Sequence, residues 1–392
     1  MKTRTMNKKK RAEQIGSARM AVAVSACLVF AASGKVVADV FIVPSISVAV
    51  IHDDNVFVTA GPREEDTITQ VSPALEAGYE GETFNARMNY GREMEKYNEF
   101  DELDSNSMRE YLDLMMDYAV SPRLSLSLVG DYIESRVPAD LNPVIGLGAG
   151  RTQGQRSSVT AGFEYRLTET LTGVMDYTDA REELSDGIGN QIHTVDASFE
   201  HDINARNQLI YGFRYSEYEF DNGFTQEVKV PRVGLLHALN DRTSIRLEAG
   251  PLKAGDEKEV YFNALLTRTH DRGNFTVGIN RDVNTVIGEA GIVEADSFNV
   301  GLLHRLGDDL QISASAGYGK VTRSDRELDE ADVIRAAVEA RYSVNNAVIL
   351  FATYNYSKQE APRIAGQSFE IPRHEVSVGV TFRIPNRSSQ NR

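Results

Sequence analysis

The sequence has a single cysteine, Cys27, and no tryptophan. A lone cysteine cannot form an intramolecular disulfide, and the paired cysteines of zinc sites are absent too. After residue 38 the chain also lacks an uninterrupted apolar run of about 20 residues, the length that a transmembrane helix needs. Any membrane-spanning part must therefore be built from strands, whose backbone groups bond to one another.

Basic residues are scarce, with 42 Lys and Arg against 57 Asp and Glu. Removing residues 1–38 takes away eight basic residues and Glu13, which leaves 34 basic against 56 acidic residues and a net charge of −22. This sign excludes nucleic acid as a partner, because phosphates must be neutralised by positive charge. The glycine motifs of dinucleotide and P-loop sites are absent, so we expect no cofactor.

The N-terminal segment predicts a signal peptide. A basic stretch over 2–19 precedes an apolar run over 20–32, and the small-residue site 36–38 follows. We therefore expect residues 1–38 to be removed and the mature chain to begin at Asp39. An alternative takes 24–27 as a lipoprotein cleavage box, but cleavage there would cut the apolar run in its middle.

The remaining chain alternates apolar and polar residues over segments of about ten residues, as strands of membrane barrels do. Short turns are expected at 80–83, 121–123, 168–170, 201–206, 240–242, 270–274, 307–309 and 345–346. Longer polar loops are expected at 53–66, 96–106, 134–156, 181–190, 219–224, 250–259, 283–296, 322–331 and 357–368. The pattern predicts an all-β fold, a transmembrane antiparallel up-and-down β-barrel of about 18 strands (16–18) over 39–392, with no plug domain. Residues 383–392 would form a short periplasmic tail.

Tyrosines gather near the ends of the predicted strands. Tyr79, Tyr118, Tyr165 and Tyr342 precede short turns, and Tyr132, Tyr177, Tyr318 and Tyr356 lie at the opposite ends. Two such rings are typical of the aromatic girdles at membrane interfaces. Segments 225–239 and 260–270 fit least well, because Pro231, His237 and Arg268 interrupt any apolar face.

The last predicted strand alternates Val376, Val378, Val380 and Phe382 with small polar residues. It resembles the C-terminal assembly signature of bacterial outer-membrane proteins, although ten further residues follow Phe382. We therefore expect the protein in the cell outer membrane, in contact with its lipids and lipopolysaccharide.

Short motifs in the first quarter carry a further resemblance. Residues 44–48, the segment Asp53-Asp54-Asn55-Val56-Phe57 and residues 71–75 resemble the type-two class of β-barrel porins that are found with exopolysaccharide and capsule synthesis genes. The resemblance implies a role in export or secretion of an exopolysaccharide, with that glycan and periplasmic export proteins as partners.

Charged residues on the polar faces of the strands are candidates for the lumen lining. The registers direct these inward: Arg87, Arg109, Asp113, Asp117, Arg166, Arg214, Arg246, Arg305, Arg335, Glu339 and Arg341. They either pair across strands and stiffen the wall, or form a mixed-charge passage for hydrated solutes or a glycan.

Loop 134–156 is the longest and has an apolar centre with Val144, Ile145 and Leu147. With no plug available, we interpret this loop as a candidate constriction folded into the barrel mouth. Contact with a partner and simple disorder are the alternatives.

Catalysis is not expected. His52-Asp53-Asp54 is the one cluster with suitable groups, and it lacks a second His-Asp pair or a Gly-x-Ser-x-Gly elbow. We expect Asp53, Asp54 and Asn55 to cap the turn after the first strand instead. Two functions remain: an export pore, or a non-conducting structural barrel that anchors a glycan or a partner at the cell surface.

Overall fold

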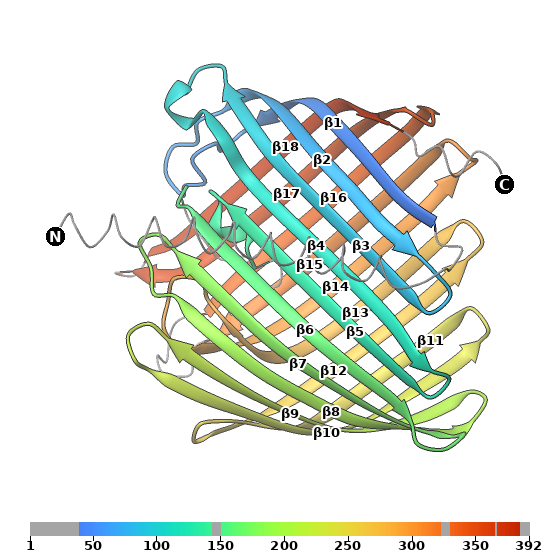
Figure 1. The fold of residues 1–392 in the computed structure, drawn as a ribbon. Helices are drawn as coiled ribbons and strands as arrows, with labels where there is room; N and C mark the ends of the chain where they lie inside the picture. The colour runs from blue at the N-terminus through green and yellow to red at the C-terminus, as the bar shows by residue number, and fades with distance from the viewer. Residues whose placement is uncertain (1–38, 143–149, 323–329, 365–366, 385–392) are drawn as a thin grey trace.

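A computed structural model describes residues 39–142, 150–322, 330–364 and 367–384. These residues form one closed antiparallel barrel, in which every strand pairs with its sequence neighbours and β1 pairs with both β2 and β18. Figure 1 shows the strands slanting around the barrel, with short turns at one end and longer connections at the other. The predicted eighteen-stranded fold is confirmed, and the described residues are used up by strands and their connections.

The bounds of the strands follow the alternating segments. The first nine are β1 (Asp39–Asp53), β2 (Asp66–Glu80), β3 (Phe84–Tyr97), β4 (Ser105–Ser121), β5 (Leu124–Ser135), β6 (Gly154–Arg166), β7 (Leu171–Leu184), β8 (Asn190–Asn204) and β9 (Asn207–Phe220). The others are β10 (Thr225–Asn240), β11 (Thr243–Ala254), β12 (Glu257–His270), β13 (Gly273–Thr285), β14 (Ile292–Leu306), β15 (Leu310–Thr322), β16 (Glu330–Asn345), β17 (Val348–Ile364) and β18 (Gln367–Arg383). In the part of the chain that the structure describes, no helix is long and apolar enough to cross a membrane.

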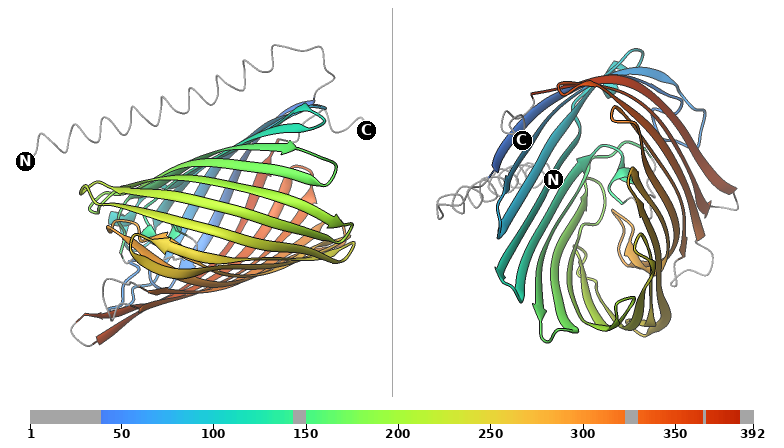
Figure 2. Two further views of the ribbon diagram at one scale, coloured as in Figure 1. Left: turned by 90° about the horizontal axis from the view of Figure 1, so that it is seen from below. Right: turned by 90° about the vertical axis from the view of Figure 1, so that its right-hand side faces the viewer.

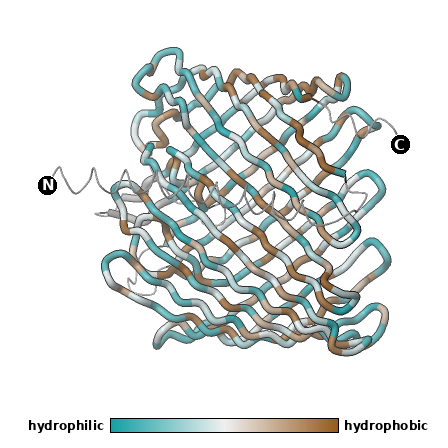
Figure 3. Tube along the Cα trace, in the orientation of Figure 1, coloured by the Kyte–Doolittle hydropathy of each residue, from teal (hydrophilic) through white to brown (hydrophobic). Residues whose placement is uncertain are grey.

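Apolar side chains cover the outside of the barrel because alternate residues of a strand point to opposite faces. On β1 and β18, for example, Val48 and Val378 are 38% and 61% exposed, and Val48 lies opposite Val380. Figure 3 shows hydrophobic residues along the strands and hydrophilic ones concentrated in the connections. Such an exposed apolar belt is stable only against lipid.

Two of the expected loops are mostly strand. In 250–259, β11 runs to Ala254 and β12 starts at Glu257, and in 357–368, β17 runs to Ile364 and β18 starts at Gln367. Segments 225–239 and 260–270, which fitted poorly, lie in β10 and β12. The exposed lysines Lys253 and Lys258 pair across β11 and β12 near the long-loop end. A strand can carry charge on its outer face where it projects beyond the lipid, and this charge gave the segment the composition of a loop.

Candidate functional site

The lumen wall is formed by the polar face of each strand. The strand registers place all eleven predicted lining residues on inward positions, on the opposite face from the apolar belt. Arg87, Arg109, Asp113 and Asp117 lie on β3 and β4, for instance, while Arg335, Glu339 and Arg341 lie on β16. The predicted set is therefore spread around the ring rather than gathered at one point.

One row of residues that pair across neighbouring strands runs along the inner face from β4 to β8 and contains several carboxylates. Asp117 lies opposite Ser127, then follow Gly162, Asp176 and Asp196 on β6, β7 and β8. A Cβ atom on Gly162 would lie 2.8 Å from Oδ1 of Asp176, so this glycine leaves room for polar side chains to lie along the wall. Within the described residues, Asp117 and Asp176 have no cation within ion-pair distance.

A second row places like charges side by side. Asp113 on β4 lies directly opposite Asp131 on β5, and Ser158 donates a 2.5 Å hydrogen bond to Asp131. Directly opposed carboxylates destabilise a strand pair. Neither carboxylate has an ion-pair partner among the residues described, so this part of the wall is not explained by pairing that stiffens the barrel.

Between β8 and β13 the charges do pair. Arg232 contacts Asp196 at 2.6 Å and Glu248 at 2.7 Å, and Arg246 contacts Glu248 at 2.5 Å. Arg214 on β9 reaches Asp282 on β13 through two hydrogen bonds of 2.8 and 2.5 Å. These contacts cross several strands and fix one side of the lumen.

The connection between β5 and β6 folds into the mouth of the barrel. Its described part, residues 136–142 and 150–153, is called the mouth segment below. Val137, Ala139 and Leu141 are buried, and Val137 and Ala139 pack in one apolar cluster with Met108 of β4. Figure 2 (right) shows chain segments lying inside the ring of strands.

Two hydrogen bonds tie the mouth segment to the far wall. Arg335 Nη2 on β16 donates to the carbonyl of Ala139 at 2.6 Å, and Asn142 Nδ2 donates to the carbonyl of Thr285 on β13 at 3.2 Å. Strand β13 is eight strands away from β5 in the ring, so the segment crosses the mouth. The predicted constriction residues Val144, Ile145 and Leu147 lie outside the described residues.

A second contact joins the mouth segment to the connection between β1 and β2. Arg151 donates from Nε to the carbonyl of Val56, its guanidinium lies 5.1 Å from the ring centre of Tyr97, and Gly150 N donates to Val58 O at 2.9 Å. The side chain of Arg151 is 9% exposed. The mouth is thus narrowed by two connections that hold each other.

The connections β7–β8 and β13–β14 also meet. Ile188 and Gly288 form an isolated antiparallel bridge. Gly187 approaches so closely that a Cβ atom there would lie 2.5 Å from the Cα of Gly288, whose φ of 88° also favours glycine. This bridge joins the β7–β8 connection to the β13–β14 connection.

The predicted motif Asp53, Asp54 and Asn55 lies where the barrel closes. Asp53 Oδ1 accepts a 2.9 Å bond from the backbone of Asn55, as the predicted capping requires. Asp54 accepts from the backbone of His374 at 2.7 Å. His52 is exposed on the outer face, whereas Asp53 is fully buried, so the two do not form a joint site.

The sequence reasoning missed Arg373 and Glu375 on β18 and Asp282 on β13. Arg373 contacts both Asp53 and Glu375, at 2.6 and 3.0 Å. The alternation of β18 carries the signal for two of these residues, because Arg373 and Glu375 share the face of Ser377. Asp282 directly precedes the expected loop 283–296, and it shares the inner face of β13 with Asn280, so the same alternation carries its signal. In the described chain, no group of three or more His, Cys, Asp or Glu residues could hold a metal ion.

A family model described as "Putative beta-barrel porin 2" matches residues 268–384, from the end of β12 through β18. The chain folds as a porin-type β-barrel. The match lies in the last third of the chain, whereas the motifs behind the predicted resemblance lie in its first quarter. The porin type is confirmed, and the link to exopolysaccharide stays a prediction.

No curated protein matches the chain. Among solved structures, OpdO of Pseudomonas aeruginosa is 12% identical, with 88% of this chain and 97% of that chain covered and a TM-score of 0.45. OccK2 (OpdF) of the same organism is 10% identical, with 88% of this chain and 98% of that chain covered and a TM-score of 0.44. A mutant of the ferric enterobactin receptor PfeA of Pseudomonas aeruginosa is 8% identical, with 88% of this chain and 80% of that chain covered and a TM-score of 0.44. The barrel architecture is therefore established by the chain's own strand pairing together with the family match.

Proposed function

We propose that this protein forms a water-filled pore through the outer membrane and that its cargo is a hydrated exopolysaccharide. The observation that carries the proposal is the closed ring of eighteen strands with a polar inner face. Barrels of about 16–18 strands enclose a channel wide enough for water. The unpaired carboxylates on β4 to β7 favour a wetted lumen, because a charge without a partner needs solvent.

A glycan is favoured as cargo by aromatic rings on the lumen wall. Phe41 lies against Gly78, Tyr111 against Gly91 and Phe351 against Gly379, on inward positions of β1, β4 and β17. Each ring covers a glycine of the neighbouring strand and offers a flat apolar face among polar groups. Sugar rings combine an apolar face with hydroxyl groups, so this surface suits them.

Beside its paired charges, the wall on the other side offers neutral hydrogen-bonding groups. Asn263 faces Asn280 across β12 and β13, and Ser315 lies on the same inner face of β15. Amide and hydroxyl groups can exchange hydrogen bonds with a passing glycan without holding it through charge. Periplasmic export proteins would then deliver the chain to the short-turn end.

Current block in a planar bilayer tests the cargo. The purified protein is inserted, a neutral polysaccharide is added on one side, and interruptions of the ionic current are counted. We expect block by the polysaccharide, and fewer and shorter events in Tyr111→Ala, whose ring faces the lumen. Tyr132→Ala is the matched control, because Tyr132 lies on the outer face of β5. A steady current without block would contradict the proposal that the cargo is a glycan, and the proposal that the protein forms a pore would still hold.

The packed mouth favours a second function, a structural barrel that holds a glycan or partner at the surface without conducting. In that case the mouth segment would seal the lumen permanently. Absence of current from a correctly folded barrel, together with retention of the polysaccharide on immobilised protein, would support this alternative.

A further inference from the structure

A buried carboxylate joins two strands that are far apart in the ring. Glu182 lies on the inner face of β7, and Thr285 ends β13, six strands further round. Thr285 Oγ1 donates a 2.6 Å hydrogen bond to Glu182 Oε2, and Asn190 Nδ2 on β8 donates to the same oxygen at 2.9 Å. Glu182 and Thr285 are 3% and 1% exposed, so this contact crosses the long-loop end of the barrel out of reach of water.

Three long connections meet at this contact. Asn142 Nδ2 of the mouth segment donates to the carbonyl of the same Thr285 at 3.2 Å. Ser185 of the β7–β8 connection donates from N and from Oγ to the carbonyl of Gln153 in the mouth segment, at 2.9 and 2.8 Å. The β7–β8 connection is bridged in turn to the β13–β14 connection. These linked segments are called the lid below and comprise residues 136–142, 150–153, 185–189 and 286–291.

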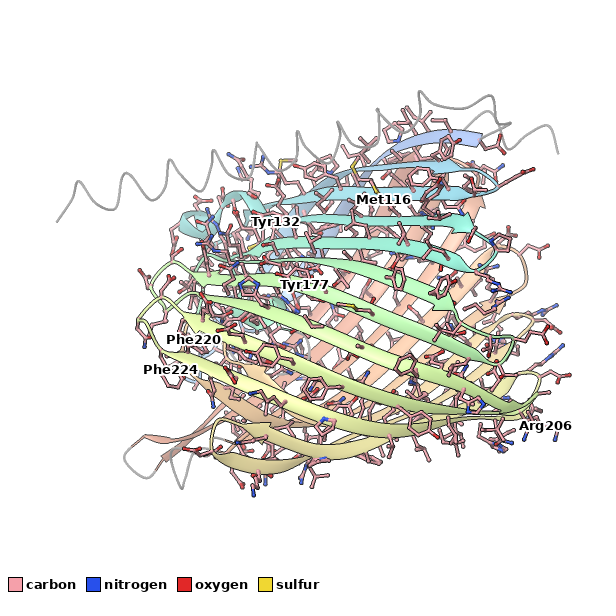
Figure 4. All side chains as sticks on the ribbon, turned by 60° about the horizontal axis from the view of Figure 1, so that its bottom comes forward. Met116, Tyr132, Tyr177, Arg206, Phe220 and Phe224 are labelled. Carbon is pink, nitrogen blue, oxygen red and sulfur yellow. The ribbon has the colours of Figure 1, made fainter. Side chains whose placement is uncertain are left out.

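The underside of the lid is partly apolar. Ile188 and Ala290 pack against a buried cluster on β9 to β12 that includes Tyr218, Phe220, Val228, Val230, Leu252 and Tyr261. Figure 4 shows Phe220 near the end of the barrel opposite Arg206, which lies in a short turn. Burial of these side chains favours the closed lid, and opening would bring them into contact with water.

The charge of Glu182 opposes closure. Its ion-pair partner is Arg156, whose Nε lies 3.8 Å from Oε1, which is too long for a hydrogen bond. That Nε is buried and finds no hydrogen-bond acceptor in the part of the chain that the structure describes. A buried carboxylate without a close cation costs free energy that contact with water would remove. The hydrogen bond from Thr285 offsets part of this cost, so its loss should favour opening.

We propose that Glu182 and Thr285 form the latch of a gate in the barrel mouth. While their hydrogen bond is made, the three connections close the mouth as one unit. When it breaks, the connections part and the carboxylate of Glu182 becomes hydrated. Control of cargo by this gate rests on the pore proposed above, whereas the opening of the lid can be measured without any current.

Thiol labelling of intact cells tests the latch. Val230→Cys places a thiol in the apolar cluster beneath the lid, and a membrane-impermeant maleimide is added outside the cells. Labelling should be slow in this reference protein and on the order of ten- to a hundredfold faster when Thr285→Val is added, since a hydrogen bond to a charged group contributes about that factor. Heat-modified migration on gels checks that each variant is folded.

Glu182→Gln tests whether the carboxylate is the acceptor that matters. The amide keeps an acceptor oxygen for Thr285 and Asn190 and removes the buried charge, so labelling should be no faster than in the reference protein. In this background Thr285→Val should accelerate labelling less, because a hydrogen bond to a neutral group contributes less. An equal acceleration in both backgrounds would overturn the pairing of the two residues.

Thr178→Val is the matched control, because it removes a hydroxyl on the inner face of β7 that bonds Thr160 at 2.8 Å and not the lid. Its labelling should stay that of the reference protein. Unchanged labelling in a folded Thr285→Val protein, or an equal rise in Thr178→Val, would overturn the latch. Single-channel recording of the same variants separates the latch from the pore: fast labelling of Thr285→Val without any current would support the latch and contradict the pore.

Discussion

Asp53 and Arg373 join the first strand of the barrel to the last. Arg373 Nη2 lies 2.6 Å from Asp53 Oδ2, and their side chains are 11% and 0% exposed. Asn55 Nδ2 adds a 3.0 Å bond to the carbonyl of Pro372. Because β1 and β18 are the pair that closes the ring, these contacts clamp the seam on which the whole barrel depends.

Breaking this clamp should weaken the closed barrel. Arg373→Gln leaves Asp53 buried without its cation, and removing one partner of a buried pair costs about 3–5 kcal/mol. We expect a clearly lower temperature for the shift from the fast, folded band to the slow, unfolded band on gels. Arg63→Gln is the control, because it removes only an exposed partner of Asp54 and should cost about 0–1 kcal/mol. Equal melting of the two variants would refute the clamp.

The lipid-facing register of β15 can be tested by charge. Ile312 and Ala314 share the outer face with Tyr318, while Ser313 and Ser315 face the lumen. Ala314→Arg should destabilise the barrel by about 2–4 kcal/mol near the bilayer midplane, and Ser315→Arg should be far milder. The measurement is reversible unfolding in urea with lipid vesicles. If the two faces tolerate arginine equally, the assignment of inside and outside is wrong.

Arg335 should control how firmly the mouth segment is held. Arg335→Gln removes the guanidinium that bonds the carbonyl of Ala139, so the segment loses a tie to the far wall. We expect higher or noisier single-channel current. Arg305→Gln removes an inward positive charge that makes no bond to the segment, which controls for the change in lumen charge. If the current rises by the same amount in both variants, the change in lumen charge explains the effect and the bond of Arg335 to the mouth segment does not.

The unpaired carboxylates should make the pore prefer cations. A salt gradient across a bilayer should give a reversal potential of the sign expected for potassium over chloride. Asp113→Asn/Asp131→Asn should move that potential toward zero, since charged rings set pore selectivity. Glu76→Gln/Arg87→Gln is a control, because the two charges neutralise each other at 2.5 Å and removing both leaves the net charge of the lumen unchanged. Anion preference in the wild type would contradict the assignment.

The sequence was sufficient for the strands and their faces because strand alternation is a local property. The inward positions predicted for Arg335, Glu339 and Arg341, for example, are those of the register. The composition predicted a loop where strands project beyond the lipid, because their outer faces carry charged residues there, such as Lys253 and Lys258.

Contacts between distant strands could not be predicted in the same way. The hydrogen bond of Asn142 to Thr285 and the ion pair of Arg214 with Asp282 depend on the shape of the closed barrel. The alternation of residues along each strand does not specify which distant residue a side chain will meet. Arg373 could have been placed inward by extending the alternation of β18, but its partner Asp53 is 320 residues away. Closure of the ring brings the two together.

Single-channel conductance of the full barrel tests the central claim most directly. The wild type should conduct, and removing residues 144–147 should raise conductance without loss of the folded band, because the flanking mouth segment lies across the lumen. Unchanged conductance on deletion would show that this connection is not the constriction. If the folded wild type and the deletion variant both conduct nothing, the protein is not a pore.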